Sequence, residues 1–225
     1  MIKLAIIGYG KMGKLIEQLA PEYGFTVQAS VDIGDDLAKA AGADVAIEFT
    51  APEAVAGNIE KLAAIKLPVV VGTTGWLKHM DQVRATVEKN GSALVWSPNF
   101  SVGVNVFLRV AREAARLLAD EKEYGAWAWE IHHDTKKDAP SGTMIKLVDE
   151  MKAAGYARNI DVSSNRAGRH PGTHEIGFDS AADTITLRHA ARSREGFARG
   201  ALKAAQWIVG KQGVFEFSDV LFSGR

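Results

Sequence analysis

The feature that most constrains the fold is a series of short apolar runs in the first hundred residues, each separated from the next by a helical or loop pattern. Apolar runs fall at residues 2–7, 25–31, 44–49, 68–71 and 93–96. Helical patterns lie at about 11–19, from Pro52 to Ile65, and up to about Lys89. Strands this apolar have no face left for water, so they are typical of a parallel sheet covered by helices on both sides. We therefore predict an α/β fold for this part of the chain.

The pattern changes after residue 100. We expect one long amphipathic helix from Val104 to Leu118, on which an apolar face repeats at Val106, Val110, Ala114 and Leu117. Residues 126–132 alternate strictly, with Trp127, Trp129 and Ile131 on one face and Ala126, Ala128, Glu130 and His132 on the other. Further elements are expected at 141–154, 173–178, 184–189, 197–208 and 214–217. These elements predict a second domain of α+β class.

Composition excludes several classes of protein. Lys and Arg number 27 and so do Asp and Glu, which argues against a nucleic-acid binder that works through overall positive charge. The absence of cysteine excludes a disulfide scaffold, a thiolate zinc site and a cysteine nucleophile. No secretory pattern and no run of about 20 apolar residues is present. We predict a soluble, cytoplasmic protein without nucleic-acid or membrane partners.

A glycine-rich loop follows the first predicted strand and opens the first helix. It reads Gly8, Tyr9, Gly10, Lys11, Met12 and Gly13. Glycines at such a junction allow a tight turn and let backbone N–H groups approach a pyrophosphate at the helix N-terminus. Asp32 ends the second strand, where an acidic side chain can accept hydrogen bonds from a ribose. The loop therefore indicates dinucleotide binding, although a purely structural turn uses glycines too.

Two later loops also follow strands and are predicted to contact the nicotinamide end of the same ligand. In an open parallel sheet, ligands lie beyond the carboxyl ends of the strands. The candidate cofactor contacts in these loops are Gly72, Thr73, Thr74, Ser97, Pro98, Asn99 and Phe100.

The densest group of chemically active side chains lies between residues 130 and 143. A proton donor near neutral pH requires His, or Lys with a shifted pKa, and this segment contains His132, His133 and Lys136. Ser141, Gly142 and Thr143 begin a helix and offer hydroxyl and N–H groups to a carboxylate. Arginines concentrated in the same half of the chain favour an anionic small molecule. His132, His133, His170 and His174 could also bind a metal, but adjacent histidines on opposite strand faces are poor co-ligands, and we predict no metal.

Taken together, these motifs resemble the dihydrodipicolinate reductase (4-hydroxy-tetrahydrodipicolinate reductase) family of lysine and diaminopimelate biosynthesis. The resemblance spans nearly the whole chain, and its most specific part is the run from Glu130 to Thr143. Other matching segments are residues 8–13, 48–50, 72–75, 99–105, 189, 193–194, 197–198 and 200–201.

The resemblance implies a role for each matching residue. His132 would be the general acid, and Lys136 a second proton donor or an electrostatic anchor. His133, Ser141, Gly142 and Thr143 would bind a small dicarboxylate, whereas the glycine loops and Asp32 would bind NADH or NADPH. It also implies a Rossmann-type dinucleotide-binding domain at 1–101, completed by 195–225, and a smaller α+β substrate and oligomerisation domain at 102–194 that assembles a homotetramer.

The chain departs from the family pattern in ways that bear on the cofactor. Its first loop is one residue shorter than the commoner form, and Ile33 and Gly34 follow Asp32 where relatives can carry an Arg for a 2′-phosphate. We therefore expect NADH to be used at least as well as NADPH. Two rival functions stay open from the residues: another two-domain dehydrogenase of amino-acid metabolism, and a non-catalytic NADH-binding sensor.

Overall fold

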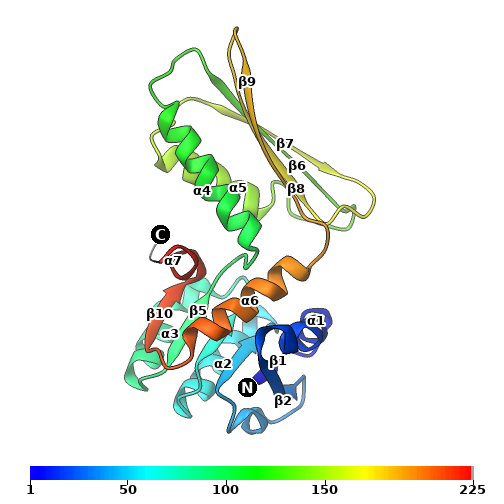
Figure 1. The fold of residues 1–225 in the computed structure, drawn as a ribbon, viewed down its shortest axis with the longest axis vertical. Helices are drawn as coiled ribbons and strands as arrows, with labels where there is room; N and C mark the ends of the chain where they lie inside the picture. Colours follow the sequence, from blue (N-terminus) through cyan, green and yellow to red (C-terminus); the bar gives the residue numbers. More distant parts are fainter. Residues whose placement is uncertain (224–225) are drawn as a thin grey trace. The chain divides into compact units, whose positions relative to one another are not determined.

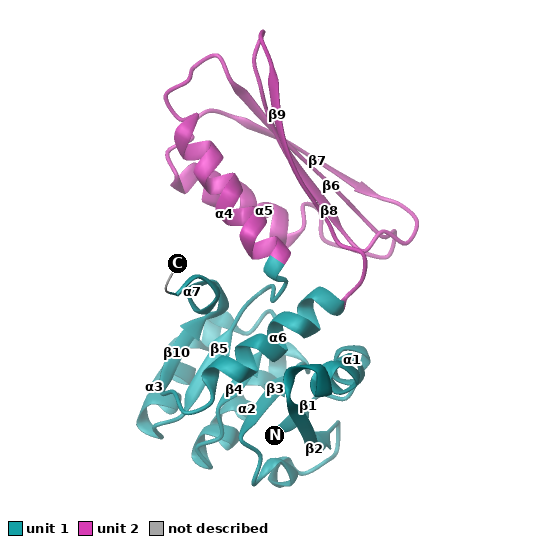
Figure 2. Ribbon diagram, in the orientation of Figure 1, with its two compact units in different colours: residues 1–102, 195–225 teal, residues 103–194 magenta. Residues whose placement is uncertain are grey.

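The structure is a computed structural model that describes residues 1–223, and the chain forms two compact units. Unit 1 comprises residues 1–102 together with the C-terminal segment that begins at Glu195, and unit 2 comprises residues 103–194 (Figure 2). The last two residues of the expected segment 195–225 lie outside the described residues. Within residues 1–223, no helix combines the length and the apolar character needed to cross a membrane.

Unit 1 is built on one parallel sheet of six strands (Figure 1). The strands are β1 (Ile2–Ile7), β2 (Phe25–Val31), β3 (Val45–Glu48), β4 (Val69–Val71), β5 (Ala93–Trp96) and β10 (Gly213–Glu216), in the order β10-β5-β4-β3-β1-β2. The chain first extends the sheet from β1 to β2, and then crosses to the other side of β1 to form β3. This reversal creates the switch point at which α/β sheets bind ligands.

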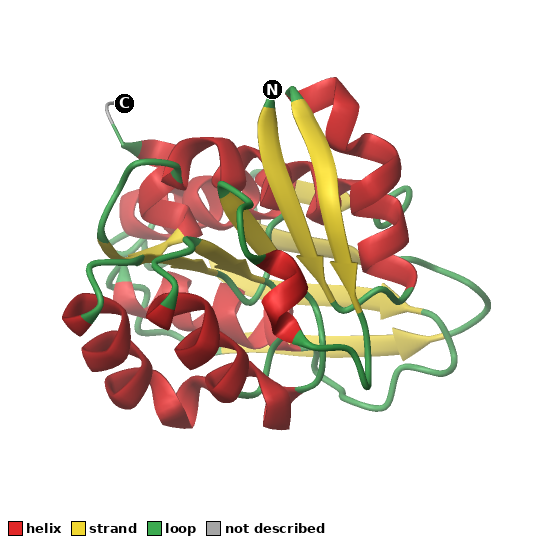
Figure 3. Ribbon diagram, turned by 90° about the horizontal axis from the view of Figure 1, so that it is seen from below, coloured by secondary structure: helices red, strands yellow, loops and turns green. Residues whose placement is uncertain are grey.

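Helices cover both faces of this sheet because successive strand residues alternate sides (Figure 3). Leu4 and Ile6 pack with residues of α1 (Lys11–Leu19) and α6 (Glu195–Ile208), whereas Ala5 and Ile7 pack with residues of α2 (Pro52–Ala64) and α3 (Met80–Lys89). A last short helix, α7 (Phe217–Phe222), adds Phe217 to the first of these cores. Three short 3-10 helices complete the unit at Ala20–Tyr23, Leu37–Ala40 and Leu77–His79.

Unit 2 is a four-stranded sheet with two helices on one face (Figure 1). Its strands are β6 (Gly125–His132), β7 (Ile160–Arg166), β8 (Thr173–Asp179) and β9 (Thr184–Ala190), in the order β7-β6-β8-β9. Only the β6–β7 pair is parallel. The helices α4 (Val102–Leu117) and α5 (Gly142–Ala153) pack on the face that carries Ala126, Ala128, Ile176 and Phe178.

The structure corrects three expectations about these elements. The predicted apolar face of α4 is wrong: Val106, Val110 and Leu117 are 39%, 45% and 61% exposed. The core instead receives Val104, Phe107, Leu108, Ala111 and Ala115. The strands and helices also include β7 and α7, which the sequence pattern did not predict. The expected last strand ends at Glu216, one residue earlier, because Phe217 begins α7.

Candidate functional site

The three glycines of the first loop have different physical reasons to be glycine. Gly8 has φ +91°, and a Cβ atom there would lie 2.0 Å from the carbonyl oxygen of Phe49. A Cβ atom on Gly13 would lie 2.3 Å from the carbonyl oxygen of Gly8. A Cβ atom on Gly10 would meet no protein atom within 4 Å. Gly8 and Gly13 are therefore required for close packing of the backbone, whereas the missing side chain at Gly10 leaves the backbone accessible to a ligand.

This open position coincides with the start of α1. Gly10 is the N-cap residue and provides no side-chain hydrogen bond to the first turn. The first N–H groups of a helix have no partner within the helix, so an uncapped N-terminus suits a phosphate. Lys11 is exposed and Met12 and Tyr9 are half-buried. The backbone here fits the pyrophosphate of a dinucleotide.

Asp32 lies directly after β2, one strand away from this loop. Its side chain is exposed, and its backbone N–H donates to Asp35 Oδ2 at 3.0 Å. Asp35 in turn pairs with Lys39. These two interactions stabilise the turn that follows β2. Asp32 lies at the same carboxyl edge of the sheet as Gly8, whose N–H donates to the carbonyl oxygen of Val31 at 2.8 Å.

The loops after β3, β4 and β5 are bonded to one another and to the core. Thr50 N–H donates to Thr73 Oγ1 at 2.7 Å, and the ring of Phe49 occupies the place that a side chain at Gly72 would need. The predicted cofactor residues divide by exposure: Thr74 and Pro98 are exposed, Gly72 and Asn99 are half-buried, and Thr73, Ser97 and Phe100 are buried. The exposed and half-buried members are the ones accessible to a ligand.

A buried carboxyl group supports these loops, and its role was missed at the sequence level. Glu48 ends β3 with no exposed surface, accepts hydrogen bonds from Thr50 Oγ1 and Asn58 Nδ2, and has no hydrogen-bond partner for Oε2. Burial raises the pKa of this carboxyl group, against the opposing effect of hydrogen bonds from Thr50, Thr73 and Asn58. The signal in the sequence is an acidic residue at the end of an otherwise apolar strand.

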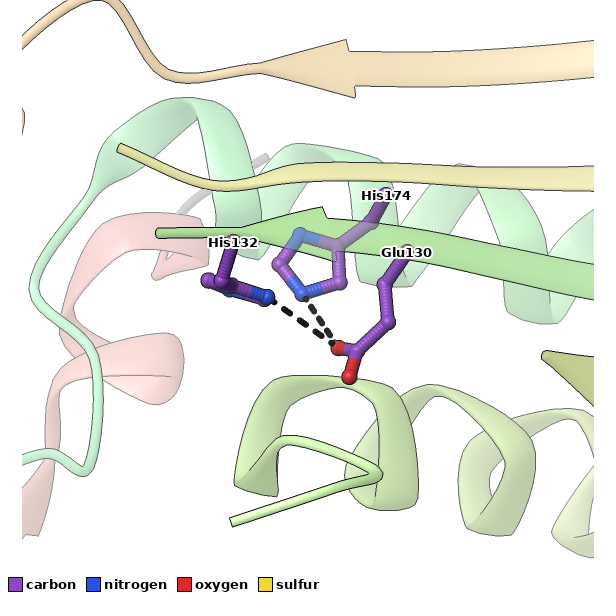
Figure 4. Close-up of side chains that lie close together, drawn as sticks. All are labelled: Glu130, His132 and His174. Atoms are coloured by element: carbon purple, nitrogen blue, oxygen red, sulfur yellow. Dashed lines mark ion pairs between the residues drawn. The ribbon is translucent and has the colours of Figure 1, made fainter. Parts of the chain in front are cut away.

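In unit 2, the predicted site segment surrounds a second buried carboxylate, Glu130 (Figure 4). Its Oε1 accepts hydrogen bonds from Ser141 N–H at 2.9 Å, Ser164 Oγ at 2.9 Å and Arg166 Nη2 at 2.8 Å. Its Oε2 accepts a hydrogen bond from Ser141 Oγ and lies 3.4 Å from Nε2 of His174. Burial alone would raise the pKa of Glu130, but the hydrogen bonds from His174, Ser141 and Arg166 outweigh it and hold the pKa well below its usual range. This carboxylate is ionised.

His132 lies on the same face of β6 as Glu130, as the alternation predicted. Its Nδ1 is 3.6 Å from Glu130 Oε2, and the side chain is 9% exposed. Burial lowers the pKa of the imidazole from 6.5 to about 4; Glu130 raises it, whereas His174, Lys136 and Arg166 lower it further. Without a ligand, His132 is therefore neutral at pH 7.

The other predicted residues of the segment surround the start of α5. Ser141 is the N-cap, and its Oγ accepts from Met144 N–H at 3.2 Å. Gly142 is exposed and Thr143 half-buried at the first turn. Lys136 Nζ donates to both carboxylate oxygens of Asp138, at 2.7 and 2.9 Å. His133 lies directly after β6, and its Nδ1 is 2.7 Å from Thr135 Oγ1.

Ligand-type atoms of Glu130, His132 and His174 lie within 4.8 Å of one another, close enough to share a metal ion. The guanidinium of Arg166 on Oε1 and the hydroxyl of Ser141 on Oε2 already occupy that carboxylate. A divalent cation would have to displace one of these hydrogen bonds and lie beside the positive charge of Arg166. The cluster is therefore better suited to holding a proton on a histidine than to binding a metal ion. The expectation of no metal stays a prediction.

The sequence pattern indicated His132 and Ser141 but gave no role to Glu130, considered His174 only as a possible metal ligand, and did not single out Arg166 among the arginines. The alternation of residues 126–132 places Glu130 on the same strand face as His132, and this was the one sequence signal that could have indicated its role. Arg166 reaches the site because it ends β7, the strand that the sequence pattern did not predict.

Solved structures with similar folds include a dipicolinate-bound dihydrodipicolinate reductase from Paenisporosarcina sp. TG-14. It matches with a TM-score of 0.81 at 23% identity, over 96% of this chain and 97% of the other. A scyllo-inositol dehydrogenase from Lactobacillus casei, solved with NAD(H) and scyllo-inositol, matches with a TM-score of 0.55 at 13% identity, over 98% and 93% of the two chains. Such likenesses show the fold and leave the activity open.

Comparisons of the amino-acid sequence distinguish among the enzyme families that share this fold. Residues 2–100 match the family described as dihydrodipicolinate reductase, N-terminus, and residues 103–221 match its C-terminus. Two relatives named 4-hydroxy-tetrahydrodipicolinate reductase come from Christiangramia forsetii (35% identical, covering 98% of each chain) and Methanosarcina acetivorans (36% identical, covering 97% of this chain and 88% of the relative). This chain belongs to the dihydrodipicolinate reductase family.

Proposed function

We propose that the chain is a 4-hydroxy-tetrahydrodipicolinate reductase, which reduces a cyclic, unsaturated dicarboxylate at the expense of NADH or NADPH. The observation that carries the proposal is the segment 130–143, in which a buried His132 lies near Lys136 and Ser141, Gly142 and Thr143 begin α5. A dinucleotide-binding loop alone is common to many dehydrogenases. Family membership over the whole chain supports the same activity.

In this function, the nicotinamide supplies hydride when it is bound, and the protein supplies orientation and a proton. Unit 1 would hold the pyrophosphate at Gly10 and the ribose at Asp32. In unit 2, Gly142 and Thr143 would hold one substrate carboxylate by their N–H and hydroxyl groups. Lys136 would hold a second negative charge, and His133 would add a donor.

His132 would protonate the electron-rich product of hydride addition. The imidazole is neutral at pH 7 in the ligand-free protein, so it must gain a proton when the substrate binds. Two substrate carboxylates bring negative charge close to the ring, and nearby negative charge raises the pKa of an imidazole. Lys136, which opposes protonation of the free site and pairs with Asp138, would also contact one of those carboxylates. Substrate binding and protonation of His132 would thus be coupled.

The open face of the unit 2 sheet supports assembly into a homotetramer. Trp127, Trp129 and Ile131 lie on the face opposite α4 and α5 and are half-buried. Trp127 stays close to the sheet because its ring covers Gly177, where a Cβ would lie 2.2 Å from an indole atom. Large aromatic side chains on the face opposite the helices are typical of a subunit interface. Cytoplasmic location and the lack of nucleic-acid or membrane partners stay predictions.

Turnover is tested by following the loss of NADH or NADPH absorbance with freshly generated substrate. Oxidation that depends on substrate supports the proposal. Tight nicotinamide binding without turnover would instead favour the sensor, and turnover with a different amino-acid substrate would favour another dehydrogenase.

Ligand binding gives a second test that separates the two units. Pyridine-2,6-dicarboxylate should compete with substrate, and a ring with one carboxylate should bind more weakly by ~1.5–3 kcal/mol, the value of a lost charged hydrogen bond. Lys136→Ala and Thr143→Val should both weaken the dicarboxylate in calorimetric titrations with cofactor present. Asp32→Ala is the matched control, because it should weaken the cofactor and leave the dicarboxylate nearly unaffected. Equal binding by all three variants would contradict this placement of the substrate.

A further inference from the structure

The two oxygens of the Glu130 carboxylate have different surroundings. Oε1 accepts three hydrogen bonds, from Ser141 N–H, Ser164 Oγ and Arg166 Nη2, and these donors fix it in place. Oε2 accepts from Ser141 Oγ and is the oxygen that faces both His132 and His174 (Figure 4). One oxygen thus anchors the side chain, and the other is presented to the histidines.

The sheet register explains why these side chains meet. Glu130 lies opposite His174 across the β6–β8 pair, and His132 follows two residues later on the same face of β6. An ionised carboxylate can only accept, so the hydrogen in its contact with His174 belongs to Nε2 of the imidazole. The rings of His132 and His174 stand edge to face, with centroids 5.0 Å apart.

The other nitrogen of His132 lies beside a glycine. A Cβ atom on Gly172 would lie 3.0 Å from His132 Nε2, so the absence of a side chain there keeps the surroundings of Nε2 clear. Nδ1, by contrast, faces Glu130 and has no hydrogen-bond partner in the neutral, ligand-free state. The ring therefore has Nδ1 directed at a fixed carboxylate and Nε2 beside a glycine, whose lack of a side chain leaves that nitrogen accessible.

We propose that Glu130 is the positioning residue for His132: its Oε2 receives the Nδ1–H of the protonated ring and so directs Nε2–H toward the substrate. This inference rests on the proposed role of His132 as the general acid. The Nδ1 to Oε2 distance of 3.6 Å lies just outside hydrogen-bond range, and a small ring movement brings the pair together once Nδ1 carries a proton. A buried carboxylate that orients a catalytic imidazole is a recurring device in enzymes.

The charges around His132 give the proposal a measurable direction. Glu130 favours the protonated ring, whereas Arg166 on β7, His174 on β8 and Lys136 in the following loop oppose it. His189 on β9 is a further titratable group, adjacent to His174, and burial lowers its own pKa. Ser141 at the start of α5 contributes a hydroxyl without a charge. Removing the charge of Glu130 should therefore make His132 harder to protonate.

The test is the pH dependence of turnover in Glu130→Gln, with Glu130→Asp and Glu150→Gln as matched variants. Glu130→Gln should lower turnover by ~10–100-fold, the range found when a partner that orients a metal-bound histidine is removed, with the Michaelis constant for substrate changed by less than about threefold. The decline of turnover at high pH should begin at lower pH than in the wild type. Glu130→Asp keeps the charge and should restore the wild-type profile. Glu150→Gln removes a carboxylate of α5 that pairs with Arg112 instead of the histidines, and should leave the profile unchanged.

Arg166→Gln provides an independent test if Glu130→Gln does not fold. Because Arg166 opposes protonation of His132, its removal should shift the decline of turnover to higher pH. A wild-type profile in Glu130→Gln or Arg166→Gln would overturn the proposal, as would equal effects of Glu130→Gln and Glu150→Gln on the profile.

NMR titration of the His132 ring separates this inference from the proposed activity, because it requires no turnover. At pH 4 the wild-type ring should be close to half protonated, and in Glu130→Gln it should remain neutral. An unchanged titration would overturn the positioning role even in an active enzyme. Absence of turnover in the wild type, with the titration shifted as expected, would contradict the proposed function alone.

Discussion

Replacing His132 with Gln should change how the stability of the protein depends on pH. The folded protein binds a proton at this ring only near pH 4, whereas the unfolded chain binds it near pH 6.5. Between these values the unfolded chain holds the proton and the folded protein does not, so lowering the pH favours unfolding. The stability associated with the neutral ring is fully present above about pH 6.5 and is lost as the pH falls toward 4.

The size of the effect follows from the two pKa values. A difference of one pKa unit corresponds to about 1.4 kcal/mol. Integrating the proton linkage between pH 7 and pH 5 gives a loss of about 2 kcal/mol in the free energy of unfolding from this ring alone. In this window Glu130 stays mostly ionised in both states, so its own contribution appears chiefly at lower pH.

The assay is urea unfolding of wild type and His132→Gln at pH 7, 6 and 5, followed by tryptophan fluorescence and circular dichroism. His189, whose pKa is also lowered by burial, contributes equally to both proteins, so the difference between the two slopes isolates His132. We expect the wild type to lose about 2 kcal/mol more than the variant over this range. Parallel pH profiles for the two proteins would refute the inference that His132 is buried in its neutral form.

Further predictions concern both units. Gly8→Ala should destabilise unit 1 by about 2 kcal/mol or more, since its Cβ would overlap a backbone carbonyl, whereas Gly10→Ala should keep near wild-type thermal stability and lose NADH affinity in calorimetry. Asp32→Ala should weaken NADH and reduce discrimination against NADPH in paired kinetic measurements. Glu48→Gln should raise the free energy of unfolding at pH 8 by about 1–3 kcal/mol. At this pH the folded wild type either holds a buried charge with an unbonded oxygen or keeps a proton that the unfolded chain would release, and an amide avoids both costs. Trp129→Lys should convert a tetramer into smaller species by light scattering; a wild-type protein that is already monomeric would contradict the proposed assembly.

The sequence predicted the strands and helices of unit 1 well because each carries a strong local signal. Residues 2–7 and 25–31, for example, form strands with the expected bounds, and the helix at 11–19 does too. Residues 4–7 are apolar and buried on both faces of the sheet, whereas residues 25–31 include polar side chains because β2 is an edge strand. The glycine loop between them then follows from the same pattern.

The helix α4 shows where periodicity fails. Its sequence contains two apolar stripes, one with Val106 and Val110 and another with Val104, Leu108 and Ala111. Both have helical spacing, and only tertiary packing determines which of them is covered. The structure buries the second stripe and exposes the first.

The strand β7 was not predicted for a different reason, and the site residues that it carries were therefore missed as well. Its inward positions include Ser164 and Arg166, polar residues that a strand pattern does not favour. Both residues are half-buried there and donate hydrogen bonds to Glu130. The carboxylate and its partners lie far apart in the sequence, so their meeting depends on strand register that local patterns do not specify.

The most direct test of the central claim is the steady-state kinetics of His132→Gln with NADH and the dihydrodipicolinate-type substrate, beside the wild type. We expect turnover in the wild type and a variant whose turnover falls by ~10²–10⁴-fold, the usual contribution of general acid catalysis, while its Michaelis constant changes little. A variant with unchanged turnover and a raised Michaelis constant would make His132 a binding residue and contradict the account.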